Sequence, residues 1–426
     1  MKVVAYPVYE NYQESGVEWI GKVPSHWQVR KGKWLFKKAS RAVRPKDSIV
    51  TCFRDGVVTL RSNRRTDGFT TALKEHGYQG IRQGDLVIHA MDAFAGAIGV
   101  SDSDGKSSPV YSACIPRFDN SVDPYFYAYY LRQIALSGLL IALAKGIRER
   151  STDFRFNDFG NLLLAVPPLS EQRAIANFLD EKCARLDEAV RIRERQIELL
   201  RERRQILIQQ AVTRGLNPDA PMKGSGVDWI GQIPAHWELR RFKFLCSICT
   251  GARNTEDRVD NATYPFFVRS QSVERIDTYS FDGEAILTAG DGAGVGKVFH
   301  YINGKFDFHQ RVYKFSDFKE VLGKYLFLYL RNNFANVALL GTAKSTVDSL
   351  RLPLIQDFEV VFPLDIQEQQ KIIETAYSED EKIADVISTK QSQITALQEY
   401  KTVLINAAVT GRIRVGGEQL AASGRL

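Results

Sequence analysis

The sequence has no apolar run approaching the roughly 20 residues that a membrane-spanning helix needs. Its first residues also lack the long apolar core of a secretory signal, because Lys2, Tyr6, Glu10 and Asn11 interrupt them. We therefore expect a cytoplasmic protein. Hydrophobic residues make up 44% of the chain and charged residues 25%, which excludes a largely disordered or fibrous protein.

Cysteine is sparse. The five residues are scattered and form no disulfide framework, which is typical of a reducing compartment. Cys246 and Cys249 have the spacing of half a zinc site, but no second such pair or nearby histidine pair completes it. We interpret the thiols as core residues and expect no metal site.

Motifs for catalysis are missing as well. Segment 290–298 resembles a phosphate-binding loop, but Asp291 replaces its first glycine and Val298 replaces the hydroxyl residue that would bind magnesium. Segment 94–99 resembles a methyl-donor loop with the wrong spacing, and no Asn-Pro-Pro-aromatic or Asp-Pro-Pro-aromatic tetrapeptide occurs. Both segments favour connecting turns. Without a nucleophile beside a base, paired carboxylates or a cofactor cradle, we expect no catalytic residue and no cofactor in this chain.

What the sequence does contain is a repeat. Gly-Val-Glu-Trp-Ile-Gly at 16–21 and Pro-Ser-His-Trp at 24–27 return as Gly-Val-Asp-Trp-Ile-Gly at 226–231 and Pro-Ala-His-Trp at 234–237. The repeat predicts two copies of one domain, each large enough for its own core. The matched histidines beside a tryptophan favour a structural role. A net charge of +7 fits a polyanionic partner, and DNA is a partner that can present two separate parts.

Both copies then pass through the same order of segments. Strand-like runs precede an aromatic helix with little regular alternation of strand and helix, which is typical of a mixed α+β domain. The matched segments, first copy before second, are 33–36 and 242–245, 60–63 and 268–271, 84–88 and 283–287, 110–111 and 312–313, and 125–132 and 324–331.

Each copy closes with a proline break and a long charged helix, in whose first turn Glu171 or Glu368 suits the helix dipole. Apolar residues repeat in steps of four and three, the pattern of a heptad seam. The residues expected to pair the helices are Leu179, Leu186, Val190, Ile197, Leu200 and Leu207 in the first and Ile383, Ile387, Ile394, Leu397 and Leu404 in the second. Gly215 and Gly411 are the expected stop signals.

The partner of each helix is predicted to be the other helix. About 45 residues at 1.5 Å per residue give a length of roughly 65 Å, longer than one domain can cover. A pseudo-twofold relation makes such a pair antiparallel. Basic residues interrupt both seams at matched positions, Arg193 with Lys390 and Arg204 with Lys401, where their charges are expected to reach water or carboxylates.

The predicted fold class is therefore α+β, with two pseudo-twofold-related mixed α/β domains separated by two long antiparallel coiled-coil helices. The expected segments are a first domain at 1–166, a first helix at 167–216, a second domain at 217–362, a second helix at 363–415 and a flexible tail at 416–426.

These markers match a known family. We call the repeated segments 16–27 and 226–237 the openers. Together with Pro-Leu-Ser-Glu-Gln-Arg-Ala-Ile at 168–175, at the start of a long helix, they resemble the specificity subunit of type I restriction-modification systems. The resemblance covers nearly the whole chain and occurs in duplicate. The second helix head departs from the pattern because Gln367 stands where serine is usual.

The resemblance implies two target-recognition domains, each reading one half of a bipartite DNA target, with the helices setting the spacing and docking modification subunits. It implies two modification subunits carrying S-adenosylmethionine and restriction subunits that use ATP and magnesium. It implies host defence and DNA methylation as the context, with a non-catalytic role for this chain.

Exposed arginine, asparagine and glutamine are the residue types that read guanine and adenine edges. The leading candidates are Arg61, Asn63, Arg64 and Arg65 in the first domain with Arg269 and Gln271 in the second. Further candidates are Lys145, Arg148, Arg150, Arg253, Asn254, His309, Gln310, Arg311 and Lys344. Each has the alternative of a solvated loop residue or a phosphate contact. Because the two sets differ, they predict an asymmetric target.

Two other classes of protein remain open at this point. A coiled-coil scaffold or a repressor-like regulator with two DNA-binding domains would share the helices and the basic charge. A nuclease or self-contained methyltransferase is less favoured because its motifs are missing.

Overall fold

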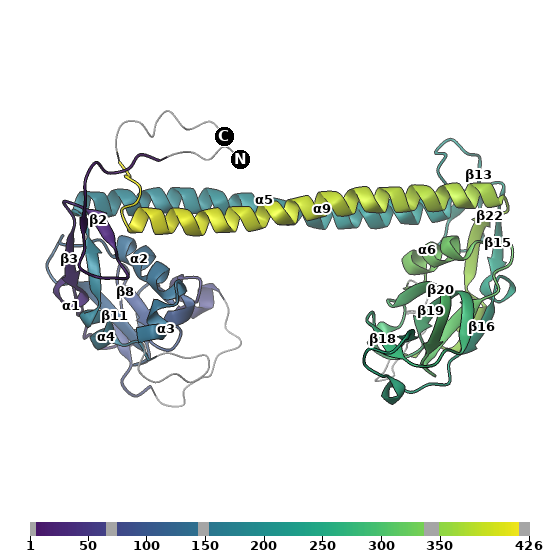
Figure 1. Ribbon diagram of the computed structural model, residues 1–426, viewed down its shortest axis with the longest axis horizontal. Helices are drawn as coiled ribbons and strands as arrows, with labels where there is room; N and C mark the ends of the chain where they lie inside the picture. The colour runs from purple at the N-terminus through teal and green to yellow at the C-terminus, as the bar shows by residue number, and fades with distance from the viewer. Residues whose placement is uncertain (1–5, 65–74, 144–152, 336–348, 417–426) are drawn as a thin grey trace. The chain divides into compact units, whose positions relative to one another are not determined.

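The computed structural model (Figure 1) describes residues 6–64, 75–143, 153–335 and 349–416. They form two compact units, Met1–Ile192 with Gln393–Leu426, and Arg193–Ser392. Each unit contains one α/β domain and a part of both long helices. Among the described residues, no helix combines the length and the apolar character that a bilayer crossing requires.

Unit 1 is built around a four-stranded antiparallel sheet in the order β4-β11-β8-β9, with smaller two-stranded sheets beside it. Its strands are β1 (Tyr12–Glu14), β2 (Lys22–Pro24), β3 (Gln28–Lys31), β4 (Phe36–Lys38), β5 (Val50–Cys52), β6 (Val58–Leu60), β7 (Gln79–Ile81), β8 (Leu86–His89), β9 (Ile98–Val100), β10 (Gly105–Ser107), β11 (Tyr111–Pro116) and β12 (Leu163–Val166). Its short helices are α1 (Gly32–Leu35), α2 (Pro124–Leu136), α3 (Leu139–Leu143) and α4 (Phe156–Asn161).

Unit 2 has a larger sheet of six strands in the order β16-β21-β19-β20-β17-β18. Its strands are β13 (Met222–Gly224), β14 (Gln232–Pro234), β15 (Trp237–Arg241), β16 (Ser247–Thr250), β17 (Tyr264–Phe267), β18 (Val273–Ile276), β19 (Phe281–Ala289), β20 (Phe299–Phe308), β21 (Val312–Ser316) and β22 (Glu359–Pro363). Its short helices are α6 (Gly323–Asn333) and α8 (Leu352–Gln356).

The predicted strands and aromatic helices are confirmed. Segments 84–88 and 283–287 form the buried strands β8 and β19, and the aromatic segments form α2 and α6. Helix α2 begins after Asp123, whose carboxylate accepts hydrogen bonds from the backbone N–H groups of Tyr125 (2.8 Å) and Phe126 (3.0 Å). Together with the surrounding strands, these helices confirm the α+β class.

The long helices are α5 (Leu169–Arg214) and α9 (Ile366–Val409). In unit 1 the start of α5 packs with the end of α9 in one core, through residues that include Leu179 and Leu404. In unit 2 the end of α5 shares a core with the start of α9, through residues that include Ile208 and Ile373. The helices are therefore antiparallel in each unit. Each ends at a glycine with positive φ, Gly215 (φ 74°) and Gly411 (φ 73°), as their sequence position predicts.

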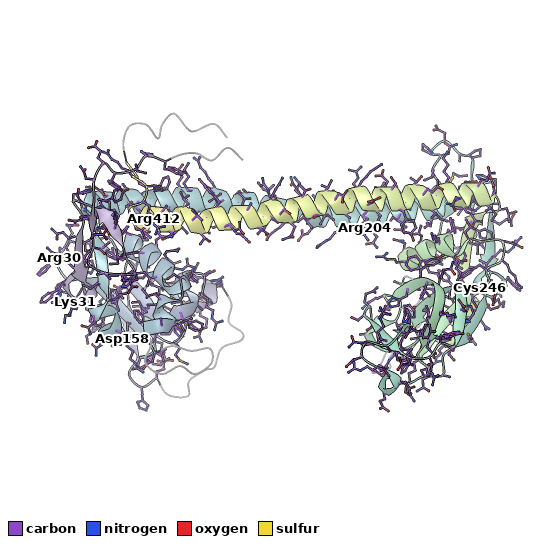
Figure 2. All side chains as sticks on the ribbon, viewed as in Figure 1. Arg30, Lys31, Asp158, Arg204, Cys246 and Arg412 are labelled. Atoms are coloured by element: carbon purple, nitrogen blue, oxygen red, sulfur yellow. The ribbon has the colours of Figure 1, made fainter. Side chains whose placement is uncertain are left out.

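The residues expected to pair the helices are all buried or half-buried along both helices. Two of the basic interruptions bind carboxylates of the opposite helix. In unit 1 Lys401 Nζ lies 2.7 Å from Asp187 Oδ1. In unit 2 Arg204, labelled in Figure 2, forms an ion pair with Asp380. These cations thus reach carboxylates, as the seam pattern predicts.

One part of the thiol prediction is wrong. Cys52, Cys114, Cys183 and Cys246 are buried, but Cys249 is exposed. Cys249 lies on β16, a strand at the edge of its sheet in which three of the four residues are exposed.

Candidate nucleic-acid interface

The same hydrogen-bonded joint fastens the opener of each unit to a long helix. In unit 1 Glu171 accepts hydrogen bonds from Trp27 Nε1 (2.9 Å) and pairs with His26 Nε2 (2.6 Å). In unit 2 Glu368 accepts from Trp237 Nε1 (2.9 Å) and pairs with His236 Nε2 (2.9 Å). The sequence assigned these glutamates to the helix dipole alone, but their carboxylates also hold the repeated tryptophan and histidine.

The glutamine after each glutamate forms a second matched joint. Gln172 is fully buried, and its Oε1 accepts from the Asp123 backbone N–H (2.8 Å) at the start of α2. Gln369 is equally buried, and its Oε1 accepts from the Leu322 backbone N–H (2.8 Å) at the start of α6. The Glu-Gln pair therefore connects both the opener and the aromatic helix to the first turn of the long helix. This frame explains why both copies keep those residues.

In unit 1 the predicted base readers surround the short 3-10 turn Arg61–Asn63 that follows β6. Arg61 is half-buried and donates from Nε to Thr51 Oγ1 (3.3 Å), while exposed Asn63 donates to Thr59 Oγ1 (2.9 Å). Arg64 makes a two-pronged ion pair with Asp55 (2.9 and 2.5 Å) and lies 4.3 Å from the centre of the Phe53 ring. The guanidinium of Arg64 is thus held over the Phe53 ring and directed by the Asp55 carboxylate.

In unit 2 the structure brings six of the predicted residues into one cluster. Asn254 Oδ1 accepts from Gln310 Nε2 (2.5 Å), and the Gln310 backbone N–H donates to Arg253 O (2.8 Å). Arg269 and Arg311 both donate to Asp291 (2.9 and 2.5 Å). The remaining member of the cluster is His309, whose Nδ1 accepts from the Arg311 backbone N–H (3.0 Å).

The other sequence-predicted residues are placed as follows. Gln271 is exposed two positions beyond Arg269. The structure does not describe the positions of Arg65, Lys145, Arg148, Arg150 and Lys344. No group of three His, Cys, Asp or Glu side chains suited to a metal ion occurs in the part of the chain that the structure describes.

Charge in the unit 2 cluster is set by Asp291. Partial burial opposes ionisation of this carboxyl group, but hydrogen bonds from Arg311 and Arg269 outweigh it and hold its pKa below the ordinary value. Burial lowers the pKa of His309, and the charge of Arg269 lowers it further. At neutral pH the cluster therefore presents three arginine cations, two of them on the Asp291 carboxylate, and a neutral imidazole.

The structure also reveals a residue pair that sequence reasoning missed. Arg44 and Asn254 occupy equivalent turns in the two units. In each turn the backbone N–H donates to the side chain of an aspartate three residues on, Asp47 or Asp257, at 2.8 Å. Arg44 follows Gly16, the first residue of its repeated segment, by the same interval as Asn254 follows Gly226. That shared interval, ending in a shared aspartate, is the signal that identifies them. This position is occupied by an arginine, which can donate to guanine, in unit 1 and by an asparagine, which can pair with adenine, in unit 2.

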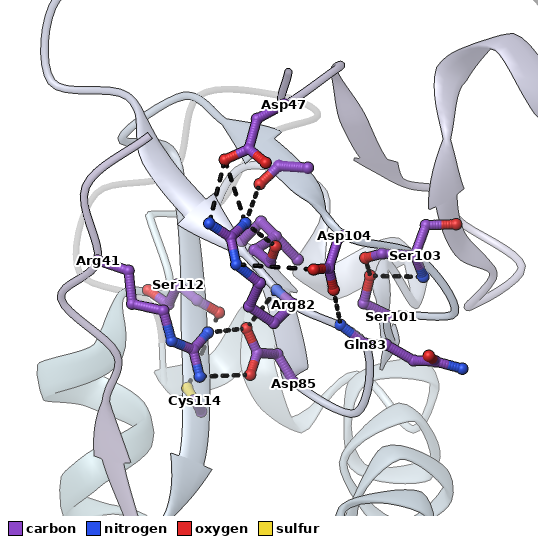
Figure 3. Close-up of polar contacts among 12 residues, drawn as sticks. Arg41, Asp47, Arg82, Gln83, Asp85, Ser101, Ser103, Asp104, Ser112 and Cys114 are labelled. Atoms are coloured by element: carbon purple, nitrogen blue, oxygen red, sulfur yellow. Dashed lines mark hydrogen bonds and ion pairs between the residues drawn. The ribbon is translucent and has the colours of Figure 1, made fainter. Parts of the chain in front are cut away.

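A network of ion pairs fixes the loop that carries Arg44 (Figure 3). Arg82 is nearly buried and donates to Asp47 Oδ2 (3.1 Å) and to Gly105 O (3.0 Å). Arg41 forms a two-pronged pair with Asp85 in the same view. Because these contacts join the loop to the turn before β8 and to β10, the loop is held on a rigid support.

Comparisons with known proteins agree with this architecture. Residues 234–397 match the family described as type I restriction modification DNA specificity domain. The chain is 31% identical to the type I restriction enzyme EcoDI specificity subunit of Escherichia coli over 188 residues, which is 43% of this chain and 40% of that subunit. The matched stretches span 40%, 54% and 63% of the curated relatives' own lengths.

Solved structures show the same fold over nearly the whole chain. The HsdS subunit from Thermoanaerobacter tengcongensis superposes with a TM-score of 0.57 at 15% identity, covering 94% of this chain and 100% of its own. A chain from a study of complex assembly and conformational transition of the type I R-M system superposes with a TM-score of 0.68 at 15% identity, covering 91% and 98%. The chain therefore matches the type I restriction modification DNA specificity domain at residues 234–397, and its fold is that of the HsdS subunit.

Proposed function

We propose that the chain is the DNA sequence-recognition subunit of a type I restriction-modification complex, and that each unit reads one half of an asymmetric bipartite target. One observation carries the proposal: two matched frames present unlike polar clusters. The tryptophan and histidine contacts of Glu171 are repeated at Glu368. The exposed side chains on the loops do not repeat.

The chemistry of those loops suits base edges. Arginine can donate two hydrogen bonds to guanine, while asparagine and glutamine can pair with adenine. Arg64 is pre-oriented by Asp55 in unit 1, and Asn254 and Gln310 already contact each other in unit 2. The excess of basic residues supports the phosphate contacts that position a protein on the duplex without specifying bases.

The long helices supply the spacing in this proposal. Helix α5 runs for 46 residues without a break. At 1.5 Å per residue such a helix is about 69 Å long. We infer that α5 and α9 set the distance between the two half-sites and offer the docking surface for two modification subunits.

We assign the chemistry to partner subunits. In this proposal the modification subunits carry S-adenosylmethionine and methylate adenine, and restriction subunits with ATP and magnesium join through them. The chain itself is not an enzyme, and the complex works on double-stranded DNA in the cytoplasm.

The decisive experiment is methylation mapping across the genome of a host that carries the chain with its neighbouring genes. We expect one methylated motif with two unlike halves separated by bases of any identity. A palindromic motif, a contiguous motif or no motif would contradict the proposal. Co-purification with a methyltransferase subunit separates it from a repressor-like regulator, which would bind its operator alone.

A further inference from the structure

We propose that one aspartate in each unit, Asp92 in unit 1 and Asp291 in unit 2, sets sequence specificity by fixing the direction of arginines that read DNA. Each aspartate is a positioning residue, since it acts through the arginines and not on the bases. The inference rests on the proposed function and names the part of each unit that determines how sharply it discriminates.

In unit 2 the carboxylate of Asp291 accepts hydrogen bonds from two arginines, an arrangement that we call the clamp. Asp291 follows β19, and its side chain is 12% exposed. Its Oδ1 accepts from Arg269 Nη1 (2.9 Å) and its Oδ2 accepts from Arg311 Nη1 (2.5 Å). The arginines come from different loops, one after β17 and one after β20, yet they converge on a single carboxylate. Their own side chains remain 43% and 61% exposed.

The clamp leaves most of each guanidinium available. A guanidinium carries five N–H donors in a planar fork, and the carboxylate takes one from each arginine. Fixing the plane before binding reduces the side-chain entropy lost when a base is engaged, because long side chains otherwise lose about 0.5 to 1.5 kcal/mol each on immobilisation. Two forks held in fixed planes suit bidentate readout of guanine.

Charge argues against a role in affinity alone. An ionised carboxylate between two arginines cancels part of their attraction for phosphates, and neighbouring arginines keep the pKa of Asp291 low enough for ionisation at neutral pH. A site selected only for general attraction to DNA would gain by losing Asp291. Its presence is explained if orientation, and hence discrimination, is what it contributes.

Unit 1 repeats the anchor without repeating the arginines. Asp92 stands after β8, the strand that corresponds to β19, and like Asp291 it immediately precedes a short 3-10 turn. Its Oδ1 accepts from Arg54 Nη2 (2.8 Å), and the Arg54 side chain is 65% exposed. An aspartate at the same position in both units, bound to different arginines, fits a shared means of orienting arginines toward two different DNA sequences. Arg54 thereby becomes a reader for the first half-site.

The test uses the full chain with its modification subunits and a pool of DNA duplexes randomised over the target length. Bound duplexes are sequenced for wild type, Asp291→Asn and Asp92→Asn. We expect Asp291→Asn to lose preference within one half-motif by about 5- to 150-fold, the value of one bidentate base contact, while the other half-motif is unchanged. Asp92→Asn should do the reverse. Affinity for a scrambled duplex should stay equal or rise, which a merely structural role would not produce.

Two further variants keep the test decisive. Asp282→Asn removes the same charge from the exposed start of β19 and should leave both half-motifs intact. Asp291→Glu keeps the charge but moves the carboxylate by one methylene, and should blunt the same half-motif as Asp291→Asn. The proposal is overturned if Asp291→Asn retains wild-type preference, or if it weakens scrambled and enriched duplexes alike. A wild-type complex that enriches no bipartite motif would refute the proposed function itself.

Discussion

The two units share a frame and differ at the loops that it supports. In unit 1 the Glu171-Gln172 pair holds the opener and α2, and in unit 2 Glu368-Gln369 holds the opener and α6. The polar loops differ between the units. Arg64 donates to Asp55 in unit 1, while Arg269 and Arg311 both donate to Asp291 in unit 2. The difference indicates that the frame residues carry stability while, in the proposed function, the unmatched loop residues carry recognition, so each can be altered alone.

The largest effect should come from the buried tryptophans of the frame. Trp27 and Trp237 are 1% and 0% exposed. Trp27→Ala and Trp237→Ala should each destabilise the protein by about 3 to 5 kcal/mol, because each leaves a cavity and removes one hydrogen-bond donor from the glutamate. Urea unfolding measures the loss, and Trp34→Ala, at a side chain 59% exposed, is the control. If only one of the two substitutions lowered the free energy of unfolding by this amount, the two frames would not be equivalent.

The buried glutamines sharpen the same comparison. Gln172→Ala and Gln369→Ala each strand the backbone N–H at the start of an aromatic helix, at a cost of about 1 to 3 kcal/mol per unsatisfied group. Gln369 should cost more, because its Nε2 donates to Glu320 O (2.9 Å) as well as to Pro363 O (2.8 Å), whereas the Nε2 of Gln172 donates to Pro167 O (2.8 Å). Thermal unfolding of each variant tests the order. The adjacent exposed residue Gln370 supplies the control, as its replacement should be nearly neutral.

A change in a loop should leave stability alone and alter recognition in one half-site. Arg64→Ala should weaken specific binding by about 1 to 3 kcal/mol if Arg64 makes a bidentate base contact. Competition between duplexes altered in one half-site at a time measures the effect. Unchanged affinity and base preference would remove Arg64 from the readers. An even loss across all sequences, with a smaller dependence on salt, would make it a phosphate contact instead.

The smallest effect is expected at the ion pairs of the helix seam. Asp187→Asn and Asp380→Asn should each cost less than about 1 kcal/mol, since exposed and half-exposed pairs contribute little. Asp380 should cost more because its side chain is 33% exposed, against 61% for Asp187. Urea unfolding at low and high salt tests the order, and equal values that do not respond to salt would contradict it.

The sequence predicts the frame well because its elements have local patterns. Heptad spacing, strand-like runs and a glycine at each helix end lie within a few residues, and the repeat lets one copy check the other. Contacts over long intervals leave no such pattern. The hydrogen bond from Trp27 to Glu171 spans 144 positions, so only the structure joins the two.

The candidate interface was less accessible to sequence reasoning for a physical reason. A positive net charge and exposed arginines point to DNA, but the direction of each arginine depends on its carboxylate partner. Asp291 counted only as the residue that spoils a phosphate loop, and Arg54 and Asp92 gave no signal at all. Their roles arise when β19 or β8 delivers the aspartate to loops that come from elsewhere in the chain.

The composition of the unit 1 core bears on the order in which the chain folds as it is synthesised. That core includes Leu404, Ala408 and Val409, and the Arg414 backbone N–H donates to Pro7 O (2.7 Å). Unit 2 is one continuous stretch, Arg193–Ser392. Domains generally fold from the N-terminus onward during synthesis. Here the later unit has all of its core residues first, and the earlier unit must wait for the last turns of α9.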